Sequence, residues 1–252
     1  MKLQGKTAII TGAASGMGKA TALLYAKEGA KVVVADINEA AAEKTVKEIT
    51  SEDGIASAHA IDVTKKEEIR RLIKNTVETY GTVDILVNNA GIMDSFEPAG
   101  EIEDEKWERI FAINSTSVMF ATREVLPIFL EKQKGVIINI ASAGGLQGAR
   151  AGAAYTASKH AVVGFTKNTG FMYAPHGVRC NAIAPGGVET NISSSMSNVS
   201  EYGMERTRPG MALNPRIGKS EEIANIALFL ASDESSFING TVITADAGWT
   251  SY

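Results

Sequence analysis

The sequence has little of what marks several large classes of protein. Its 252 residues include one cysteine, Cys180, so no disulfide can form within the chain. The three histidines, His59, His160 and His176, do not have the spacing of metal ligands. No apolar run approaches the roughly 20 residues of a membrane span, and no signal-peptide-like stretch precedes the first expected strand. We therefore expect a cytoplasmic protein with no bound metal and no membrane partner.

An excess of positive charge is also missing. The chain has 25 Lys and Arg against 29 Asp and Glu, a formal net charge of −4. Nucleic-acid-binding proteins need a basic face for the phosphates, so we expect no nucleic-acid partner. A hydrophobic fraction of 44% and a charged fraction of 21% are ordinary for a globular protein and exclude general disorder.

Short apolar, β-branched runs alternate along the chain with longer segments of helical pattern. Apolar runs without polar alternation are typical of strands buried on both faces of a parallel sheet. We expect an α/β fold of the doubly wound (Rossmann) kind, with a seven-stranded parallel sheet and helices on both faces, in a single domain over residues 1–252. The expected strands contain residues 8–10, 32–34, 56–61, 85–87, 136–140, 178–183 and 241–244, and the expected helices span 16–29, 38–51, 65–80, 104–133, 153–174 and 220–232.

The sequence also predicts where some of these helices begin or break. Asn38 and Thr64 are residue types that favour the N-cap position. Pro127 should kink or break the long segment 104–133, because proline lacks the N–H and its ring clashes with the preceding turn.

Residues 186–218 interrupt the alternation and show no clear period. A loop of this length inside a compact domain is usually functional or disordered. We expect it to be a substrate loop within the single domain. Its methionines either form an adaptable apolar lid or pack the short helices of the loop itself: Met196, Met204 and Met211.

A glycine-rich turn, Thr11–Gly18, follows the first expected strand and opens the first helix. In an open parallel sheet this is where a dinucleotide pyrophosphate meets the free N–H groups of a helix. Asp36 ends the second strand about 20 residues further on, where an acid can bind the adenosine ribose and repel a 2′-phosphate. With neutral Ser15 and Ile37 nearby, the pattern favours NAD over NADP. A merely flexible loop, and an Asp36 that only caps the next turn, are the alternatives.

Further motifs follow in an order that resembles the short-chain dehydrogenase/reductase family. Two departures, Ala141 and the Asp246-Ala247-Gly248 segment, remove no functional side chain. The motifs that carry the resemblance are Thr11-Gly12-x-x-x-Gly16-x-Gly18, Asp62-Val63, Asn88-Asn89-Ala90-Gly91, Asn114, Ser142, Tyr155-x-x-x-Lys159, Pro185-Gly186 and Thr190. The resemblance implies that NAD is bound by Gly12, Ser15, Gly16, Met17, Gly18, Asp36, Ile37, Asp62, Val63, Asn89, Ala90, Gly91, Tyr155, Lys159, Pro185, Gly186, Val188 and Thr190.

Tyr155 and Lys159 are four residues apart, so on a helix they share one face. A phenol of pKa near 10 is a poor base, and lowering that pKa by two to three units takes roughly 3–4 kcal/mol. A cation about 4 Å away supplies about 4 kcal/mol at an effective dielectric constant of 20. We therefore expect Lys159 to lower the pKa of Tyr155 enough for general-base catalysis. In isolation, an amphipathic helix pair without catalytic duty would be the better interpretation of these two residues.

The resemblance implies a role for each member of the catalytic set. Tyr155 exchanges a proton with the substrate oxygen, Ser142 orients that oxygen, Lys159 also binds the nicotinamide ribose, and Asn114 relays protons through water. Ser142 could instead be an ordinary turn hydroxyl, and Asn114 a polar residue bonded to nearby backbone. We expect His160 and Cys180 to be structural.

The predicted activity is NAD-dependent hydride transfer between a secondary alcohol and its ketone. A 3-oxoacyl-thioester (acyl-carrier-protein) reductase is the alternative enzyme, and a non-catalytic NAD-binding regulatory protein is the alternative of another class. The resemblance implies a homotetramer, with the helices over 104–133 and 153–174 at one interface. Candidate substrate contacts, chosen by position in the resemblance, are Met93, Gly144, Leu146, Gln147 and Gly187.

Overall fold

The computed structural model, which describes residues 1–251, contains one parallel sheet of seven strands in the order β3-β2-β1-β4-β5-β6-β7. The sequence order reverses at β1, which pairs with β2 on one side and β4 on the other. This confirms the doubly wound fold and places its switch point beyond the carboxyl ends of β1 and β4. The strands are β1 (Thr7–Thr11), β2 (Lys31–Asp36), β3 (Ile55–Ala60), β4 (Ile85–Asn88), β5 (Gly135–Ile140), β6 (Val178–Pro185) and β7 (Val242–Ala245).

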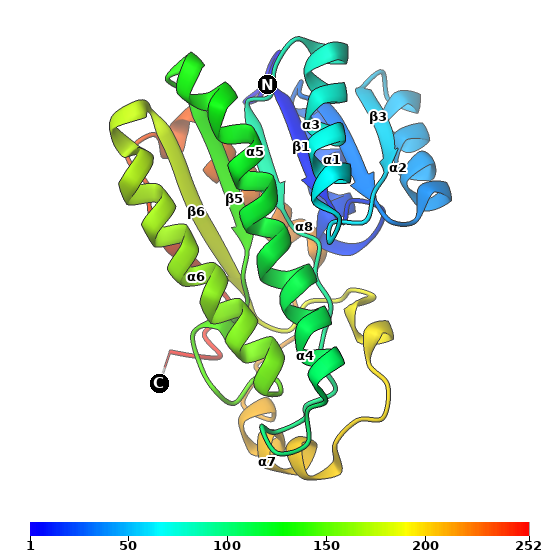
Figure 1. Cartoon of the computed structure of the whole chain (residues 1–252), viewed down its shortest axis with the longest axis vertical. Helices are drawn as coiled ribbons and strands as arrows, with labels where there is room; N and C mark the ends of the chain where they lie inside the picture. Colours follow the sequence, from blue (N-terminus) through cyan, green and yellow to red (C-terminus); the bar gives the residue numbers. More distant parts are fainter. Residues whose placement is uncertain (252) are drawn as a thin grey trace.

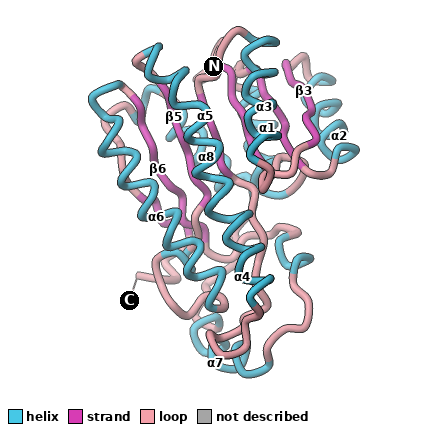
Figure 2. The backbone as a smooth tube through the Cα atoms, viewed as in Figure 1, coloured by secondary structure: helices cyan, strands magenta, loops and turns pink. Residues whose placement is uncertain are grey.

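Helices cover both faces of the sheet (Figures 1 and 2). In Figure 1, α5 and α6 lie in front of the strands and α8 behind them. Among the described residues, none of the helices combines the length and the apolar character that a membrane span requires. The helices are α1 (Gly16–Lys27), α2 (Glu39–Ser51), α3 (Lys66–Tyr80), α4 (Asp104–Phe111), α5 (Ser117–Lys132), α6 (Ala153–Tyr173), α7 (Glu201–Met211) and α8 (Ser220–Ala231).

Two apolar layers hold the helices to the sheet, and β1 contributes to both. Ile10 packs in the layer with α1, α2 and α8, whereas Ile9 packs in the layer with α3 and α5. Neither side chain is accessible to solvent, which is the physical reason for an apolar run without alternation. The Tyr25 hydroxyl donates to the Ala227 carbonyl at 2.8 Å and so joins α1 to α8 within the first layer.

Of the two expectations for Pro127, the break was wrong, and the kink stays a prediction. Pro127 lies inside α5, and the long segment changes instead at Ala112–Thr116, a π-helical turn between α4 and α5. Val125 and Phe129, on either side of the proline, are fully buried, so packing holds α5 together where one backbone hydrogen bond is lost. A π turn inserts an extra residue into the helix and often marks a functional site.

Two other boundary expectations had different outcomes. Asn38 caps α2, since its side chain accepts the Ala41 N–H at 3.1 Å. Thr64 does not cap α3, whose N-cap is Lys65. The Thr64 hydroxyl donates instead to the carboxylate of Asp62 at 2.7 Å, because the aspartate two residues earlier is the nearer strong acceptor.

The segment 186–218 is more ordered than its sequence pattern indicates. It contains a short 3-10 turn, Ile192–Ser195, and the helix α7, whose first turn is capped by Ser200. Figure 1 shows it beyond the carboxyl ends of the strands, next to α4 and the start of α6. The segment therefore lies at the end of the sheet where a parallel α/β fold binds its ligands.

Candidate active site

A groove of about 390 Å³ lies at the switch point, a size typical of small-molecule sites. It is lined by most of the predicted cofactor residues: Gly12, Ser15, Gly16, Met17, Asp36, Ile37, Asp62, Val63, Asn89, Ala90, Gly91 and Thr190. The wall also includes residues that sequence reasoning missed: Ile61, Ile92, Arg109, Ile113, Asn191, Ile192, Ser194 and Ser195. Arg109 and Ile113 share a helix face, but no local pattern links that face to the glycine turn.

The glycine turn is tight because the chain makes close approaches there. Gly12 and Gly16 have φ values of +63° and +52°, in the left-handed region that favours glycine. A Cβ on Gly18 would lie 2.2 Å from the Gly12 carbonyl oxygen. Asn89 ties the turn to the end of β4 by donating to the carbonyls of Thr11 and Gly12, both at 2.9 Å. The turn is thus a cradle that side chains would fill, and it fits a dinucleotide phosphate.

Asp36 stands at the end of β2, on the wall of this groove. Its carboxylate accepts the Ala14 N–H and the Asn38 N–H, each at 3.0 Å. The interpretation of Asp36 as a turn cap therefore has a basis in the structure. These two bonds also fix the carboxylate in place and leave it with acceptor capacity for a ribose hydroxyl.

Asp62 carries a second acid into the groove, after β3. Burial raises the pKa of its carboxyl, but hydrogen bonds from Thr64 and the positive charges of Lys65 and Arg109 together hold that pKa below its usual value. Asp62 is therefore an ionised acceptor at neutral pH.

The structure brings Tyr155, Lys159 and Ser142 together. Tyr155 and Lys159 lie in the first two turns of α6 and are 6% and 3% exposed. The Lys159 ammonium lies 5.7 Å from the centre of the Tyr155 ring and donates to the Ile140 carbonyl at 2.8 Å, at the end of β5. Ser142 follows β5 and forms a hydrogen bond with the Tyr155 side chain.

Asn114 lies in the π turn and is almost completely buried. Its amide accepts the Ile92 N–H at 2.9 Å and donates to the Ile92 carbonyl at 3.0 Å and to Ser158 at 3.2 Å. A Cβ on Gly91 would lie 3.3 Å from the Asn114 oxygen and 3.4 Å from the Lys159 nitrogen. Gly91 lines the groove, so its lack of a side chain joins the groove to the predicted catalytic residues.

The expected effect of Lys159 on the pKa of Tyr155 was wrong for the chain by itself. Burial raises the pKa of the Tyr155 phenol, the Ser142 hydrogen bond opposes this rise, and the negative charge of Asp94 adds to it. Burial also lowers the pKa of Lys159 to about 8. Desolvation acts against the charged form of each side chain, because both lie in the same dry site.

Six of the predicted cofactor contacts do not line the groove. Two of them, Tyr155 and Lys159, belong to the neighbouring group described above, and three lie after or at the end of β6: Pro185, Gly186 and Val188. Pro185 closes β6, and the Gly186 N–H donates to the Ala245 carbonyl at 3.0 Å. Val188 packs against the apolar layer of α1 and α8. Contacts between β6 and β7 therefore account for Pro185 and Gly186, and packing on the apolar layer accounts for Val188. Gly18 also lies outside the groove wall, and its contribution is the close approach to Gly12.

The predicted substrate residues divide into two groups. A Cβ on Gly144 would lie 3.4 Å from both the Ser142 oxygen and the Tyr155 ring, so Gly144 adjoins the predicted catalytic residues. Gly144 lies in a short 3-10 turn, Ala143–Gly145, and two candidates follow it. Gln147 donates to the carbonyl of Thr250 at 3.3 Å, and Leu146 is 39% exposed. The two other candidates belong with the segment 186–218. The N–H of Met93 donates to the Ser195 hydroxyl of this segment at 2.9 Å. Gly187 lies within the segment, and a Cβ there would meet the Asn214 side chain at 2.8 Å.

A family model and the similar known proteins assign the chain to the same family. Residues 12–250 match the family model described as Enoyl-(Acyl carrier protein) reductase. The 3beta-hydroxysteroid dehydrogenase 2 of Eggerthella lenta is 46% identical to this chain over 251 residues, which are 99% of this chain and 96% of that protein. The chain belongs to the short-chain dehydrogenase/reductase family.

Two further members of this family are similar over nearly the whole chain. The 3-oxoacyl-[acyl-carrier-protein] reductase FabG of Thermotoga maritima is 38% identical and covers 98% of this chain and 99% of its own. The crystal structure of levodione reductase has a TM-score of 0.91 and 33% identity, and covers 99% of this chain and 100% of its own. This short-chain dehydrogenase/reductase is an oxidoreductase that depends on a nicotinamide nucleotide and acts on CH–OH groups or the matching carbonyls.

Two features of this oxidoreductase lie away from the site. Cys180 is fully buried in β6, and burial raises the pKa of its thiol to about 12, so it behaves as a core residue, as expected. A larger cavity of about 560 Å³ opens at the amino ends of the strands, where Lys6 and Gly135 lie. Ligands of an open parallel sheet bind at the carboxyl ends, so this cavity is not the catalytic one.

Proposed function

We propose that the protein oxidises a secondary alcohol to a ketone with NAD, and catalyses the reverse reduction with NADH. The observation that carries this proposal is the grouping of Ser142, Tyr155 and Lys159 beside Gly91, at the edge of the dinucleotide groove. Bound NAD accepts or supplies the hydride. The glycine turn would hold the pyrophosphate, and Asp36 the adenosine ribose.

In this proposal Tyr155 holds and moves the proton. Its raised pKa keeps the phenol protonated at neutral pH, so it is ready to donate to the oxygen of a ketone. Oxidation needs the ionised phenol and should gain rate as the pH rises. Ser142 would orient the reacting oxygen, Lys159 would bind the nicotinamide ribose, and Asn114 would relay protons to Lys159.

Substitution Tyr155→Phe tests the catalytic assignment. We expect turnover to fall by at least about 100-fold, because proton transfer by a positioned side chain contributes about that much. NADH binding, followed by fluorescence, should change little, since the groove wall is intact. Turnover near the wild-type value in the phenylalanine variant would refute the role of Tyr155.

Asp36 supports NAD as the cofactor. A 2′-phosphate would lie against a carboxylate that two backbone N–H groups hold in place. We expect kcat/KM to be higher with NAD than with NADP, and Asp36→Ala to reduce that ratio. An equal or higher kcat/KM with NADP in the wild type would contradict the assignment.

For the substrate, ring alcohols of the hydroxysteroid kind come first, because the relative that is 46% identical bears that name. A 3-oxoacyl-thioester reductase is the second candidate, supported by the relative from Thermotoga maritima. Asp36 counts against it, since that role usually uses NADPH. A panel of hydroxysteroids, simple cyclic alcohols and 3-hydroxyacyl thioesters with NAD separates the two. A non-catalytic NAD-binding role would leave every substrate unconverted, and the retained Tyr155 and Lys159 count against it.

We further propose a cytoplasmic homotetramer. The small residues of α6 divide between the core and the surface. Ala154 is fully buried, whereas Ala161 and Gly164 are exposed, and a Cβ on Gly164 would meet no atom within 4 Å. The exposed pair supports close approach by a helix of another subunit.

A further inference from the structure

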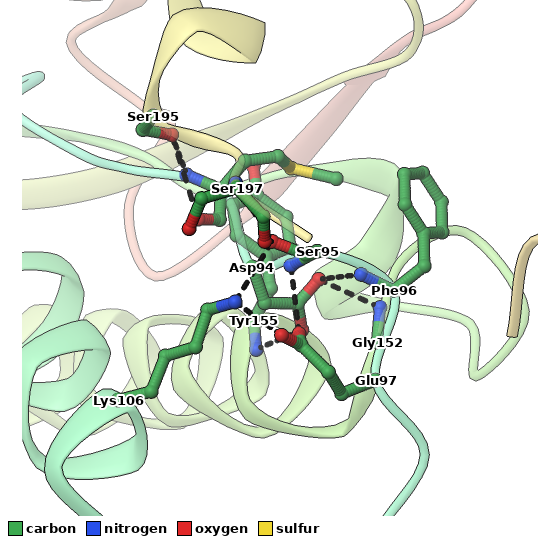
Figure 3. Close-up of polar contacts among 10 residues, drawn as sticks. Asp94, Ser95, Phe96, Glu97, Lys106, Gly152, Tyr155, Ser195 and Ser197 are labelled. Atoms are coloured by element: carbon green, nitrogen blue, oxygen red, sulfur yellow. Dashed lines mark hydrogen bonds and ion pairs between the residues drawn. The ribbon is translucent and has the colours of Figure 1, made fainter. Parts of the chain in front are cut away.

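Asp94 is a buried carboxylate that sequence reasoning did not identify. It lies in the loop between β4 and α4, and none of its surface is accessible to solvent. The carboxylate accepts three backbone N–H groups: from Phe96 at 3.1 Å, from Gly152 at 2.9 Å and from Tyr155 at 2.9 Å (Figure 3). One of these donors belongs to the residue that carries the catalytic phenol.

These bonds cap the amino end of α6 from outside the helix. The first N–H groups of a helix have no partner within it, and here the N-cap residue is Gly152, which has no side chain to supply one. A Cβ on Gly152 would lie 2.5 Å from an Asp94 oxygen and 2.7 Å from the Glu97 nitrogen. The glycine therefore allows the carboxylate to reach the Tyr155 N–H directly.

The same loop also holds the segment 186–218. Ser95 donates its hydroxyl proton to the Ser197 carbonyl at 2.6 Å and accepts the Ser197 N–H at 3.1 Å. The Ser200 N–H donates to the Ser95 carbonyl at 2.9 Å. Residues that cap α6 and residues that bind the substrate loop are thus neighbours in one short stretch of chain, residues 93–97.

Glu97 and Lys106 hold this stretch in place from the side of α4. The Glu97 carboxylate accepts the Ser95 N–H at 2.7 Å and pairs with the Lys106 ammonium, which also donates to the Ser95 hydroxyl at 2.8 Å. The Glu97 carbonyl accepts the Ala153 N–H at 2.8 Å, a further bond to the start of α6. Figure 3 shows the contacts of Ser95, Glu97 and Lys106 next to Asp94 and Tyr155.

We propose that Asp94 is the positioning residue for Tyr155, and that residues 93–97 transmit the position of the substrate loop to the first turn of α6. The inference rests on the proposed function of Tyr155. It assigns Asp94 no contact with substrate or cofactor. Its effect is to fix the backbone from which the phenol extends and to place a negative charge near that phenol.

The charge gives a signature that a merely structural role would lack. The charged groups near the Tyr155 phenol are Asp94 and Lys159, and those packed around Asp94 are Glu97 and Lys106. The Asp94 charge raises the pKa of Tyr155, so its removal should lower that pKa. The pH profile for alcohol oxidation should then move to lower pH, because the ionised phenol forms earlier.

The test compares Asp94→Asn with Asp84→Asn. Asp84 is also an aspartate that accepts a backbone N–H across two elements, from Thr7 at 2.9 Å, but at the opposite end of the sheet. We expect Asp94→Asn to lower kcat by about 10- to 100-fold, since small misplacement of a reacting group has effects of that size. NADH affinity should hold, and the oxidation profile should shift to lower pH. Asp84→Asn should keep kcat and the profile even where it lowers thermal stability.

Gly152→Ala separates the effect of the position of the Asp94 carboxylate from the effect of its charge. It also replaces Asp94→Asn as the test if that variant fails to fold. The added methyl group pushes the carboxylate away but leaves it charged, so kcat should fall with a smaller shift of the profile. Unchanged kcat and profile in folded Asp94→Asn, or effects equal to those of Asp84→Asn, would overturn the inference. Tyr155→Phe distinguishes the two failures: if it stays active, the proposed function fails, and if it is inactive while Asp94→Asn behaves as wild type, only the positioning role fails.

A separate experiment tests whether residues 93–97 transmit the position of the substrate loop to α6. Ser95→Ala removes the hydroxyl that bonds Ser197 but leaves the Asp94 carboxylate in place. We expect a higher KM for the alcohol together with a lower kcat. When Asp94→Asn and Ser95→Ala are combined, the losses in kcat should be less than multiplicative. Fully multiplicative losses would show that the two contacts act independently and would exclude the transmission.

Discussion

Lys159 places an ammonium group where water does not reach it. Burial lowers its pKa to about 8, from an ordinary value of 10.5. Between these two pH values the unfolded chain binds the proton and the folded chain does not, so stability rises with pH across that window. Below pH 8 both states are charged, and the full cost of burying the charge, about 3 kcal/mol, bears on the folded state. A residue with a proposed role in the reaction thus destabilises the fold that holds it.

Replacing Lys159 by methionine should therefore stabilise the protein at pH 7. We expect a gain of about 2 kcal/mol, since the lost bond to the Ile140 carbonyl offsets about 1 kcal/mol. The gain should shrink as the pH rises from 8 towards 10.5. Urea unfolding at pH 7 and pH 10 measures it, with Lys47→Met, at an exposed position of α2, as control. A stability equal to that of the wild type at both pH values would contradict the burial cost.

Among the elements, the turn after β5 and the helix α6 must approach closely to form the site. Ser142 lies on the turn, and Tyr155 and Lys159 on the helix. A Cβ on Gly145 would lie 2.8 Å from the carbonyl oxygen of Lys159, which is backbone and cannot move aside. The distance between the Ser142 hydroxyl and the Tyr155 phenol therefore depends on the absence of a side chain at Gly145.

Gly145→Ala should move the turn away from α6. We expect a loss of about 1–3 kcal/mol of stability from overpacking, and a lower kcat because Ser142 leaves the phenol. Gly148→Ala is the matched control in the same loop, since a Cβ there would meet no atom within 4 Å. Thermal unfolding and kcat are measured for both. Equal effects of the two substitutions would exclude the close approach as the cause.

At the scale of the whole molecule, the exposed side of α6 carries small residues. Ala161 and Gly164 lie one turn apart on it, away from the sheet. A helix surface that stays in water usually carries polar side chains. The small residues on this surface of α6 instead suit a surface that packs against a helix of another subunit.

Ala161→Arg should therefore disrupt the proposed tetramer without unfolding the chain. The arginine would enter the subunit contact, where its charge and length have no room. Light scattering after size exclusion gives the mass, and circular dichroism checks the fold. The assembly proposal is lost if the wild-type protein is already monomeric at micromolar concentration, or if the variant keeps the wild-type mass.

The sequence by itself determined the features that depend on neighbours along the chain. Apolar runs gave the strands, because a strand buried on both faces has no polar alternation. The glycine turn could be placed because its glycines lie between the first strand and the first helix, where side chains would block the turn. The shared face of Tyr155 and Lys159 follows from helical spacing alone.

Tertiary structure alone decided what depends on residues far apart in sequence. Asp94 carries no local motif, and only the fold brings it to the N–H of Tyr155. Pro127 stays within a helix because the residues around it are buried, a fact about packing. The raised pKa of Tyr155 has the same origin, since desolvation is set by every element that closes over the phenol and not by the lysine four residues away.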